Sequence, residues 1–126
     1  MSSDSHVRLT LPADASFLTV CRAALSGILA DAEDDEVEES KLVLSEVCAA
    51  ALDHADDGRL EIEFRQLPGA IEIVVSSRGD RTFLDDPVAL EVVDRLTSRW
   101  HVDRDPETGS ASVTFARRLR PVDEIV

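Results

Sequence analysis

The most informative segment of this chain is residues 42–55, LVLSEVCAAALDHA. Apolar side chains recur here and just before it at helical spacing, which predicts an amphipathic helix over about 35–55. Glu46 lies on this strongly apolar helix. A half-buried carboxylate loses hydration, and desolvation can tune it toward general-base catalysis. The other interpretation is a glutamate at the edge of the apolar stripe with its carboxylate in water. The residue type alone leaves both open.

The sequence before this helix predicts one strand and one further helix. Polar and apolar residues alternate over 5–11, which indicates a half-buried strand that ends at Pro12. Asp14 is a suitable cap for an amphipathic helix over about 16–31. The acidic run over 32–39 is then interpreted as a connecting turn and a helix N-terminus, where carboxylates favour the positive end of the helix dipole.

The sequence after the central helix predicts mainly strands. Strict alternation over 59–66 and 70–77, joined by Leu67-Pro68-Gly69, is typical of a β-hairpin. A third helix follows over about 88–96. Residues around Trp100 and around Val113 are predicted to form two more strands.

This order of elements favours an α+β fold. We expect a two-layer sandwich, a mostly antiparallel five-stranded sheet with about three helices on one face. A length of 126 residues suits a single domain over 1–126.

The charge balance narrows the classes of partner. The chain has 13 Lys and Arg against 26 Asp and Glu, a formal net charge of −13. Nucleic acid and anionic membranes should repel such a chain, whereas a basic protein should be attracted. The one basic cluster, Arg117, Arg118 and Arg120, is expected to pair with carboxylates and is a weaker candidate for contact with an acidic partner.

The cysteines and histidines suggest no metal chemistry. Cys21 and Cys48 fall in helical apolar stripes and are interpreted as small core residues. The three histidines show no metal-ligand spacing, so no metal site is expected. The N-terminus lacks the layout of a signal peptide, and no apolar run is long enough to span a membrane, so we expect a cytoplasmic protein.

The segment LVLSEVCAAALDHA resembles the E-x-x-x-N-A-x-x-H helix of the GHKL (histidine-kinase-like) ATPase superfamily, and most closely that of the anti-sigma-factor serine kinases. The order of elements and the C-terminal stretch VVDRLTSRWHVDRDPETGSASVTFARRL are also similar. In that family a Glu is the base toward the substrate serine, an Asn four residues later holds magnesium, a D-x-G-x-G box binds adenine and lid glycines close over the phosphates. The resemblance therefore implies a nucleotide site at these positions.

The magnesium position departs from the family pattern. The resemblance places the general base at Glu46 and the family's histidine at His54, but Ala50 stands at the magnesium-ligand position. Magnesium needs oxygen ligands, and an alanine side chain has none. No metal ligand is carried over to this chain.

The adenine and lid positions depart as well. The adenine-binding Asp falls at Ser77, Gly79 keeps the first glycine of the box, and the second glycine falls at Arg81. The lid glycines fall at Pro87 and Ala89. A loop that cradles phosphate needs closely approaching backbone amides, which glycine favours. We therefore expect a degenerate nucleotide site.

Two arginines could offset part of this loss. Arg78 and Arg81 lie in the box and could bind an anion, or they could be solvated loop arginines.

The resemblance also implies dimerisation through the N-terminal strand and first helix, and a basic partner-contacting residue on that helix. Thr19 occupies that position, and Arg22 lies about one turn on. A homodimer is compatible with this pattern.

These departures favour a regulatory binding protein over an enzyme. We expect an anti-sigma regulatory factor-like protein that controls transcription by binding a sigma factor or its antagonist, with lost or weakened ATP binding. The alternatives are an active kinase that phosphorylates a serine or threonine of an anti-anti-sigma factor, and a heterodimerising regulator of an intact kinase paralogue. No cofactor is expected unless ATP and magnesium bind a working site.

Overall fold

The computed structural model describes residues 5–54, 58–78 and 86–119. Its elements, in chain order, are β1 (Ser5–Pro12), the 3-10 turn η1 (Ala15–Phe17), α1 (Leu18–Ile28), α2 (Asp34–His54), β2 (Arg59–Leu67), β3 (Ala70–Arg78), α3 (Pro87–Leu96), β4 (Arg99–Asp105) and β5 (Ser110–Arg118).

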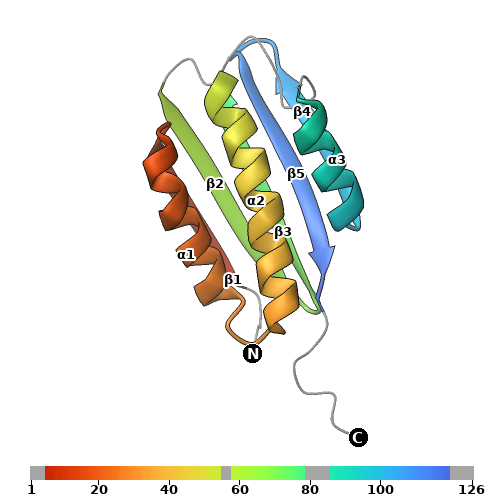
Figure 1. Ribbon diagram of the computed structural model, residues 1–126. Coiled ribbons are helices and arrows are strands. Elements are labelled where there is room, and N and C mark those ends of the chain that lie inside the picture. The colour runs from red at the N-terminus through yellow and green to blue at the C-terminus, as the bar shows by residue number, and fades with distance from the viewer. Residues whose placement is uncertain (1–4, 55–57, 79–85, 120–126) are drawn as a thin grey trace, which may run out of the picture.

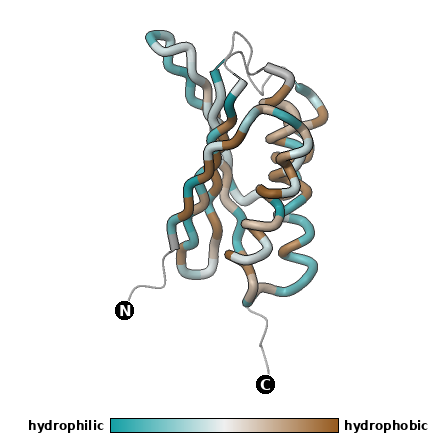
Figure 2. The backbone as a smooth tube through the Cα atoms, turned by 90° about the vertical axis from the view of Figure 1, so that its left-hand side faces the viewer, coloured by the Kyte–Doolittle hydropathy of each residue, from teal (hydrophilic) through white to brown (hydrophobic). Residues whose placement is uncertain are grey.

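The strands form one five-stranded sheet in the order β1-β2-β3-β5-β4. Every neighbouring pair is antiparallel. The three α-helices cover one face of this sheet (Figure 1), and a view from the side shows the two layers (Figure 2). The predicted α+β two-layer sandwich is confirmed.

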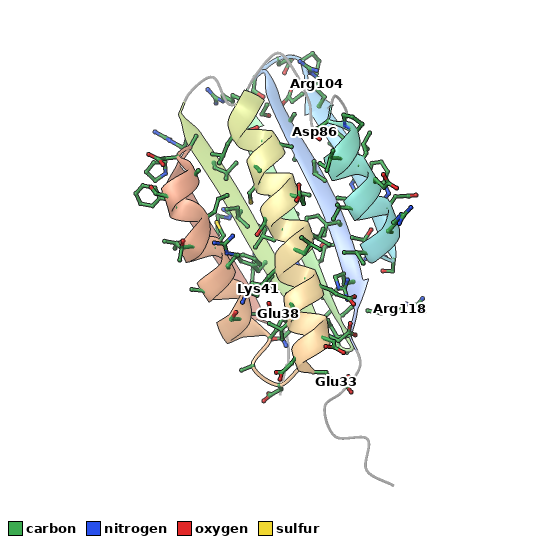
Figure 3. The ribbon with its side chains drawn as sticks, in the orientation of Figure 1. Glu33, Glu38, Lys41, Asp86, Arg104 and Arg118 are labelled. Carbon is green, nitrogen blue, oxygen red and sulfur yellow. The ribbon has the colours of Figure 1, made fainter. Side chains whose placement is uncertain are left out.

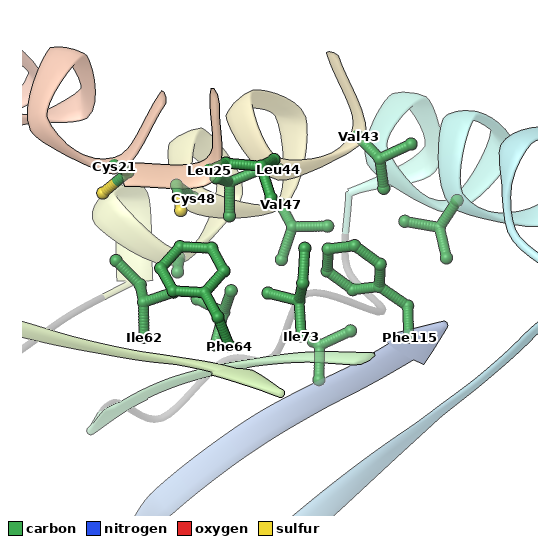
Figure 4. Packing of buried hydrophobic residues seen from close by; sticks show 14 of the residues in the cluster. Cys21, Leu25, Val43, Leu44, Val47, Cys48, Ile62, Phe64, Ile73 and Phe115 are labelled. Atoms are coloured by element: carbon green, nitrogen blue, oxygen red, sulfur yellow. The ribbon is translucent and has the colours of Figure 1, made fainter. Parts of the chain in front are cut away.

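The core lies between the helices and the covered face of the sheet. Alternate residues of the strands point into it, among them Phe64 of β2 and Phe115 of β5. They pack below Val47 of α2 (Figure 4). Cys21 and Cys48 are buried in the same cluster, as predicted. The pKa of the Cys48 thiol is well above its ordinary value. The larger cause is hydrogen bonding with Cys21 and the smaller one is burial, so this thiol stays protonated.

The uncovered face of the sheet is polar and carries ion pairs between strands. Arg8 of β1 lies opposite Glu63 of β2, and their side chains are 3.1 Å apart. Glu72 of β3 pairs with Arg65 at 3.7 Å and with Arg99 at 3.4 Å. Three arginines of this acidic chain are therefore matched by carboxylates on this face.

The first predicted helix is longer than the observed one. The sequence predicted a helix over about 16–31, but α1 ends at Ile28 and its first residues form η1 instead. Leu29 is 1% exposed although it is already the C-cap. Helical spacing predicted that Leu29 is buried, but it could not show where the backbone leaves the helix. Asp14 does act as a cap, but of η1 and not of α1, because its carboxylate accepts a hydrogen bond from the Ser16 amide at 2.9 Å.

The central helix begins where the acidic run predicted. Asp34, Asp35 and Glu36 form the first turn of α2, near the positive end of its dipole. The sequence Asp56-Asp57-Gly58 predicts the end of this helix, but Asp56 and Asp57 lie outside the described residues. Gly58 has a φ of 68°, a conformation that favours glycine.

A buried arginine joins β5 to the helical layer. The Arg117 side chain is 6% exposed and its Nη2 lies 2.8 Å from Glu36 and 3.0 Å from Glu39, both on α2. Its Nη1 donates a hydrogen bond to the carbonyl of Leu96 at the end of α3, at 2.6 Å. The expected pairing of the basic cluster with carboxylates is confirmed for Arg117. Its burial removes it from contact with an acidic partner, while Arg120 lies outside the described residues.

We expect Arg117→Met to lower the free energy of unfolding by about 3–5 kcal/mol, because Glu36 would stay buried without its cation. Urea denaturation followed by circular dichroism measures this loss. The control is Arg95→Met, which removes an exposed pair with Glu91 and should cost only about 0.5 kcal/mol. A loss below about 1 kcal/mol for Arg117→Met would contradict the role assigned to the buried pair.

Acid should weaken the pairing between β1 and β2. The pKa of Glu63 is lowered by hydrogen bonds from His6 and from Arg8. A carboxylate with a lowered pKa contributes stability above its unfolded pKa, near 4.3, and loses it as the pH falls through the lowered value. Glu63→Gln should therefore cost about 0.2–1 kcal/mol at pH 7, and this cost should shrink below about pH 4. Urea titrations at both pH values test this, with Glu107→Gln as the control. A cost that is equal at the two pH values would argue against it.

Candidate functional site

The candidate catalytic residue lies on α2 among buried hydrocarbon. Glu46 is half-buried, and its neighbours Val43 and Val47 are fully buried. Ala50, one turn further on, is 1% exposed and belongs to the hydrophobic core. The structure therefore keeps Glu46 at the edge of the apolar stripe. The position that the resemblance gives to a magnesium ligand is filled by a methyl group inside the core.

The candidate adenine position lies at the end of β3. Ser77 is half-buried and pairs with Ala111 of β5, and Arg78 is exposed and pairs with Ser110. A cavity of about 330 Å³ brings these residues together with charged and hydroxyl side chains from β2 and from the β4–β5 turn. Its lining is Arg59, Glu61, Ser76, Ser77, Arg78, Asp105, Thr108 and Ser110. Arginines and carboxylates are equal in number there, so the cavity has no excess of positive charge. Gly79 and Arg81 lie outside the described residues.

The start of α3 carries a feature that the sequence analysis missed. Asp86 is the N-cap of this helix, and its carboxylate accepts hydrogen bonds from the amides of Val88 and Ala89, both at 3.1 Å. Figure 3 shows Asp86 at this end of α3. An Asp directly before Pro87 is itself a signal for a capped helix start, because proline is favoured at the first helical position. Two amides of the helix N-terminus are thus already bound by a carboxylate of the chain.

The two candidate partner residues on α1 differ in their surroundings. Thr19 is exposed, whereas Arg22 is half-buried and its Nη1 donates a hydrogen bond to the Ser45 hydroxyl of α2 at 3.3 Å. Two apolar side chains at the start of this helix, Phe17 and Val20, are 37% and 42% exposed. Sequence reasoning did not single them out, because neither belongs to the apolar stripe that faces the core.

Among residues 5–54, 58–78 and 86–119, no group of three or more His, Cys, Asp or Glu side chains is arranged to hold a metal ion. None of the helices in those ranges is long and apolar enough to cross a bilayer.

The five-stranded antiparallel sheet with its helical layer is consistent with the fold of a histidine-kinase-like ATPase domain. No family model matches the chain. The chain is similar to serine-protein kinase RsbW of Staphylococcus aureus strains JH9, Newman and USA300, with 33% identity over 86 residues in each case. The similarity covers 63% of this chain and 54% of each relative, so the chain spans about half the length of the curated relatives it matches. It is a partial homologue of these serine-protein kinases.

The cap at the start of α3 can be tested directly. Asp86→Ala should lower the free energy of unfolding by about 1 kcal/mol and speed hydrogen exchange at the amides of Val88 and Ala89, because both lose their acceptor. Asp86→Asn is the matched control, since asparagine caps helices about as well as aspartate. If Asp86→Ala and Asp86→Asn behave alike, the carboxylate does not hold these amides.

Proposed function

We propose that this chain is an anti-sigma regulatory factor-like protein that controls transcription by binding a sigma factor or its antagonist, with ATP binding lost or weakened. The observation that carries the proposal is the Asp86 carboxylate on the amides of Val88 and Ala89. A helix N-terminus is a favourable site for phosphate only when its amides are free to donate. Here an anion of the chain itself already accepts from them.

The surroundings of α2 support the same proposal. A magnesium ion that bridges the phosphates of ATP needs oxygen ligands at close to octahedral geometry. Ala50 offers none, and its burial in the core leaves no room for a water molecule at that methyl group. Ser77 can make a hydrogen bond to adenine, but it lacks the charge that strengthens such a bond. These residues therefore support the proposal that binding of ATP and magnesium is lost or weakened.

Protein binding is supported by the surface and by the relatives. Exposed Phe17 and Val20 lie at the start of the first helix, the element that the family resemblance assigns to subunit contacts. A net charge of −13 should steer the chain toward a basic partner and away from nucleic acid. The partial homology to serine-protein kinases favours a regulator that keeps the scaffold of such a kinase.

A second candidate function is an active serine kinase, and Glu46 is the observation that favours it. Its half-buried carboxylate lies on the helix that the resemblance assigns to the general base. Phosphoryl transfer depends mainly on positioning and on neutralising the phosphate charge around the metal. A general base without a metal ligand neither positions the phosphates nor neutralises their charge, so we place this function second.

The decisive experiment is isothermal titration calorimetry of the chain with millimolar ATP, with and without magnesium. We expect no measurable heat in either titration, because the phosphate and metal positions lack suitable donors and ligands. A Staphylococcus aureus RsbW preparation titrated in the same buffers is the positive control. Micromolar, magnesium-dependent binding to this chain would overturn the proposal and return the kinase to first place.

Phosphate transfer and partner binding separate the two candidates further. The wild-type chain and Glu46→Gln should bind an immobilised sigma factor or antagonist equally well, and neither should label the antagonist with radioactive phosphate. Labelling by the wild type that Glu46→Gln abolishes would instead assign Glu46 as the base of an active kinase.

A further inference from the structure

A second cavity lies at the opposite end of the fold from Asp86. It has a volume of about 240 Å³ and is enclosed by the turn between α1 and α2, the β2–β3 hairpin and the residue that follows β5. These segments meet at the lower end of the molecule in Figure 1. The lining is Leu29, Asp31, Ala32, Gln66, Leu67, Gly69, Ala70 and Leu119.

The chemistry of this cavity suits a hydrocarbon group of moderate size. Most of its lining side chains are aliphatic, and Leu29 forms part of the core behind it. The backbone of its wall is already engaged, because the amide of Leu119 donates to the carbonyl of Gly69 at 2.9 Å. Pockets for drug-sized ligands have volumes of roughly 300–1,000 Å³, whereas an apolar cavity of about 150 Å³ holds a benzene ring. A single aliphatic or aromatic side chain is therefore the occupant that fits.

Negative charge lies on the side of the cavity that the turn between α1 and α2 forms. Asp31 lines it, and Asp34 and Asp35 follow at the start of α2. All three are exposed, and none forms an ion pair with another residue in the part of the chain that the structure describes. Glu33, which lies between Asp31 and Asp34 in the sequence, is at the same lower end in Figure 3. Carboxylates that are such near neighbours in the sequence repel one another, and a bound cation would relieve that repulsion.

The neighbouring cations of the chain are directed elsewhere. Arg117 is buried against Glu36 and Glu39, and Lys41 pairs with Glu38 at 3.2 Å. Arg118 is exposed, and as the neighbour of Arg117 on β5 it faces the other side of the sheet (Figure 3). Within the described ranges, these cations leave the carboxylates of Asp31, Asp34 and Asp35, here called the rim, available to an incoming group.

We infer that this cavity docks one aliphatic or aromatic side chain of a short, basic partner segment whose Lys or Arg residues pair with Asp31, Asp34 and Asp35. The side-chain amide of Gln66 has no hydrogen bond with any residue in the described ranges and can bind the backbone of that segment. The inference adds a second contact surface to the proposed regulatory function. Its test uses neither nucleotide nor sigma factor, so its failure and that of the proposed function are distinguishable.

Charge complementarity favours a basic partner over a second copy of the chain. Two copies would bring two net charges of −13 together and place carboxylates against carboxylates at the rim. A basic segment gains both the burial of its apolar side chain and the attraction of the rim, and the latter should weaken as salt rises.

The test is a titration of the isotopically labelled chain with the peptide acetyl-KRLKR-amide, followed by amide NMR shifts. We expect shifts at Leu29, Ala32, Gly69 and Leu119, and binding that weakens with added salt. The peptides KRSKR and EELEE, which lack the apolar side chain or the positive charge, should bind at least about tenfold more weakly. Equal binding of either control peptide, or shifts confined to other parts of the chain, would overturn the inference.

Matched variants locate the binding to the cavity. Ala32→Leu fills it and should weaken KRLKR binding by about tenfold, whereas Ala30→Leu adds the same side chain to an exposed position outside the lining. Asp31→Asn should weaken it roughly two- to fivefold, and Glu107→Gln on the β4–β5 turn should leave it unchanged. Thermal unfolding checks that each variant is folded. Unchanged affinity of folded Ala32→Leu for the peptide would overturn the inference. Amide NMR shifts that depend on protein concentration without peptide would also overturn it, because a second copy of the chain would then occupy the cavity.

Discussion

The buried guanidinium of Arg117 constrains the arrangement of the whole molecule. A charge taken out of water is costly unless fixed partners surround it, and here those partners come from α2 and from the end of α3. The strand β5, which carries Arg117, lies between β3 and β4 in the sheet. A shift of either helix along the sheet would separate this charge from its partners. The position of α2 is therefore set by a directional interaction as well as by the apolar packing beneath it.

The fixed position of α2 determines the chemistry available in its C-terminal half. Ala50, toward its C-terminal end, is held inside the core, and Glu46 lies at the edge of the apolar stripe. Near this end of the molecule the Asp86 carboxylate occupies amides of α3. Hydrocarbon and negative charge thus lie at positions where the family resemblance would call for oxygen ligands and free donors. The protein binding that we propose for this chain needs none of this chemistry.

The acidity of the chain is unevenly distributed over its surface. On the uncovered face of the sheet, arginines and carboxylates pair between strands, as Arg8 does with Glu63. At the start of α2 the exposed carboxylates of Asp34 and Asp35 have the helix dipole as their support. Negative charge is therefore concentrated where an apolar cavity opens, and this combination distinguishes that end from an ordinary solvated surface.

The spacing of apolar residues and the turn-forming residues in the sequence by themselves determined the order of strands and helices, the antiparallel hairpin and the buried side chains of α2. These features depend on residues that are neighbours along the chain, so the local spacing of apolar and polar residues predicts them. The sequence also placed Ala50 and Ser77 at critical positions through the family resemblance. Only the tertiary structure decided that Arg117 is buried with Glu36, more than eighty positions away, and that Arg22 is tied to Ser45. It likewise brought Leu29, Gly69 and Leu119 to one cavity. Such contacts join residues that are distant in sequence, and local periodicity holds no information about which distant side chains will meet.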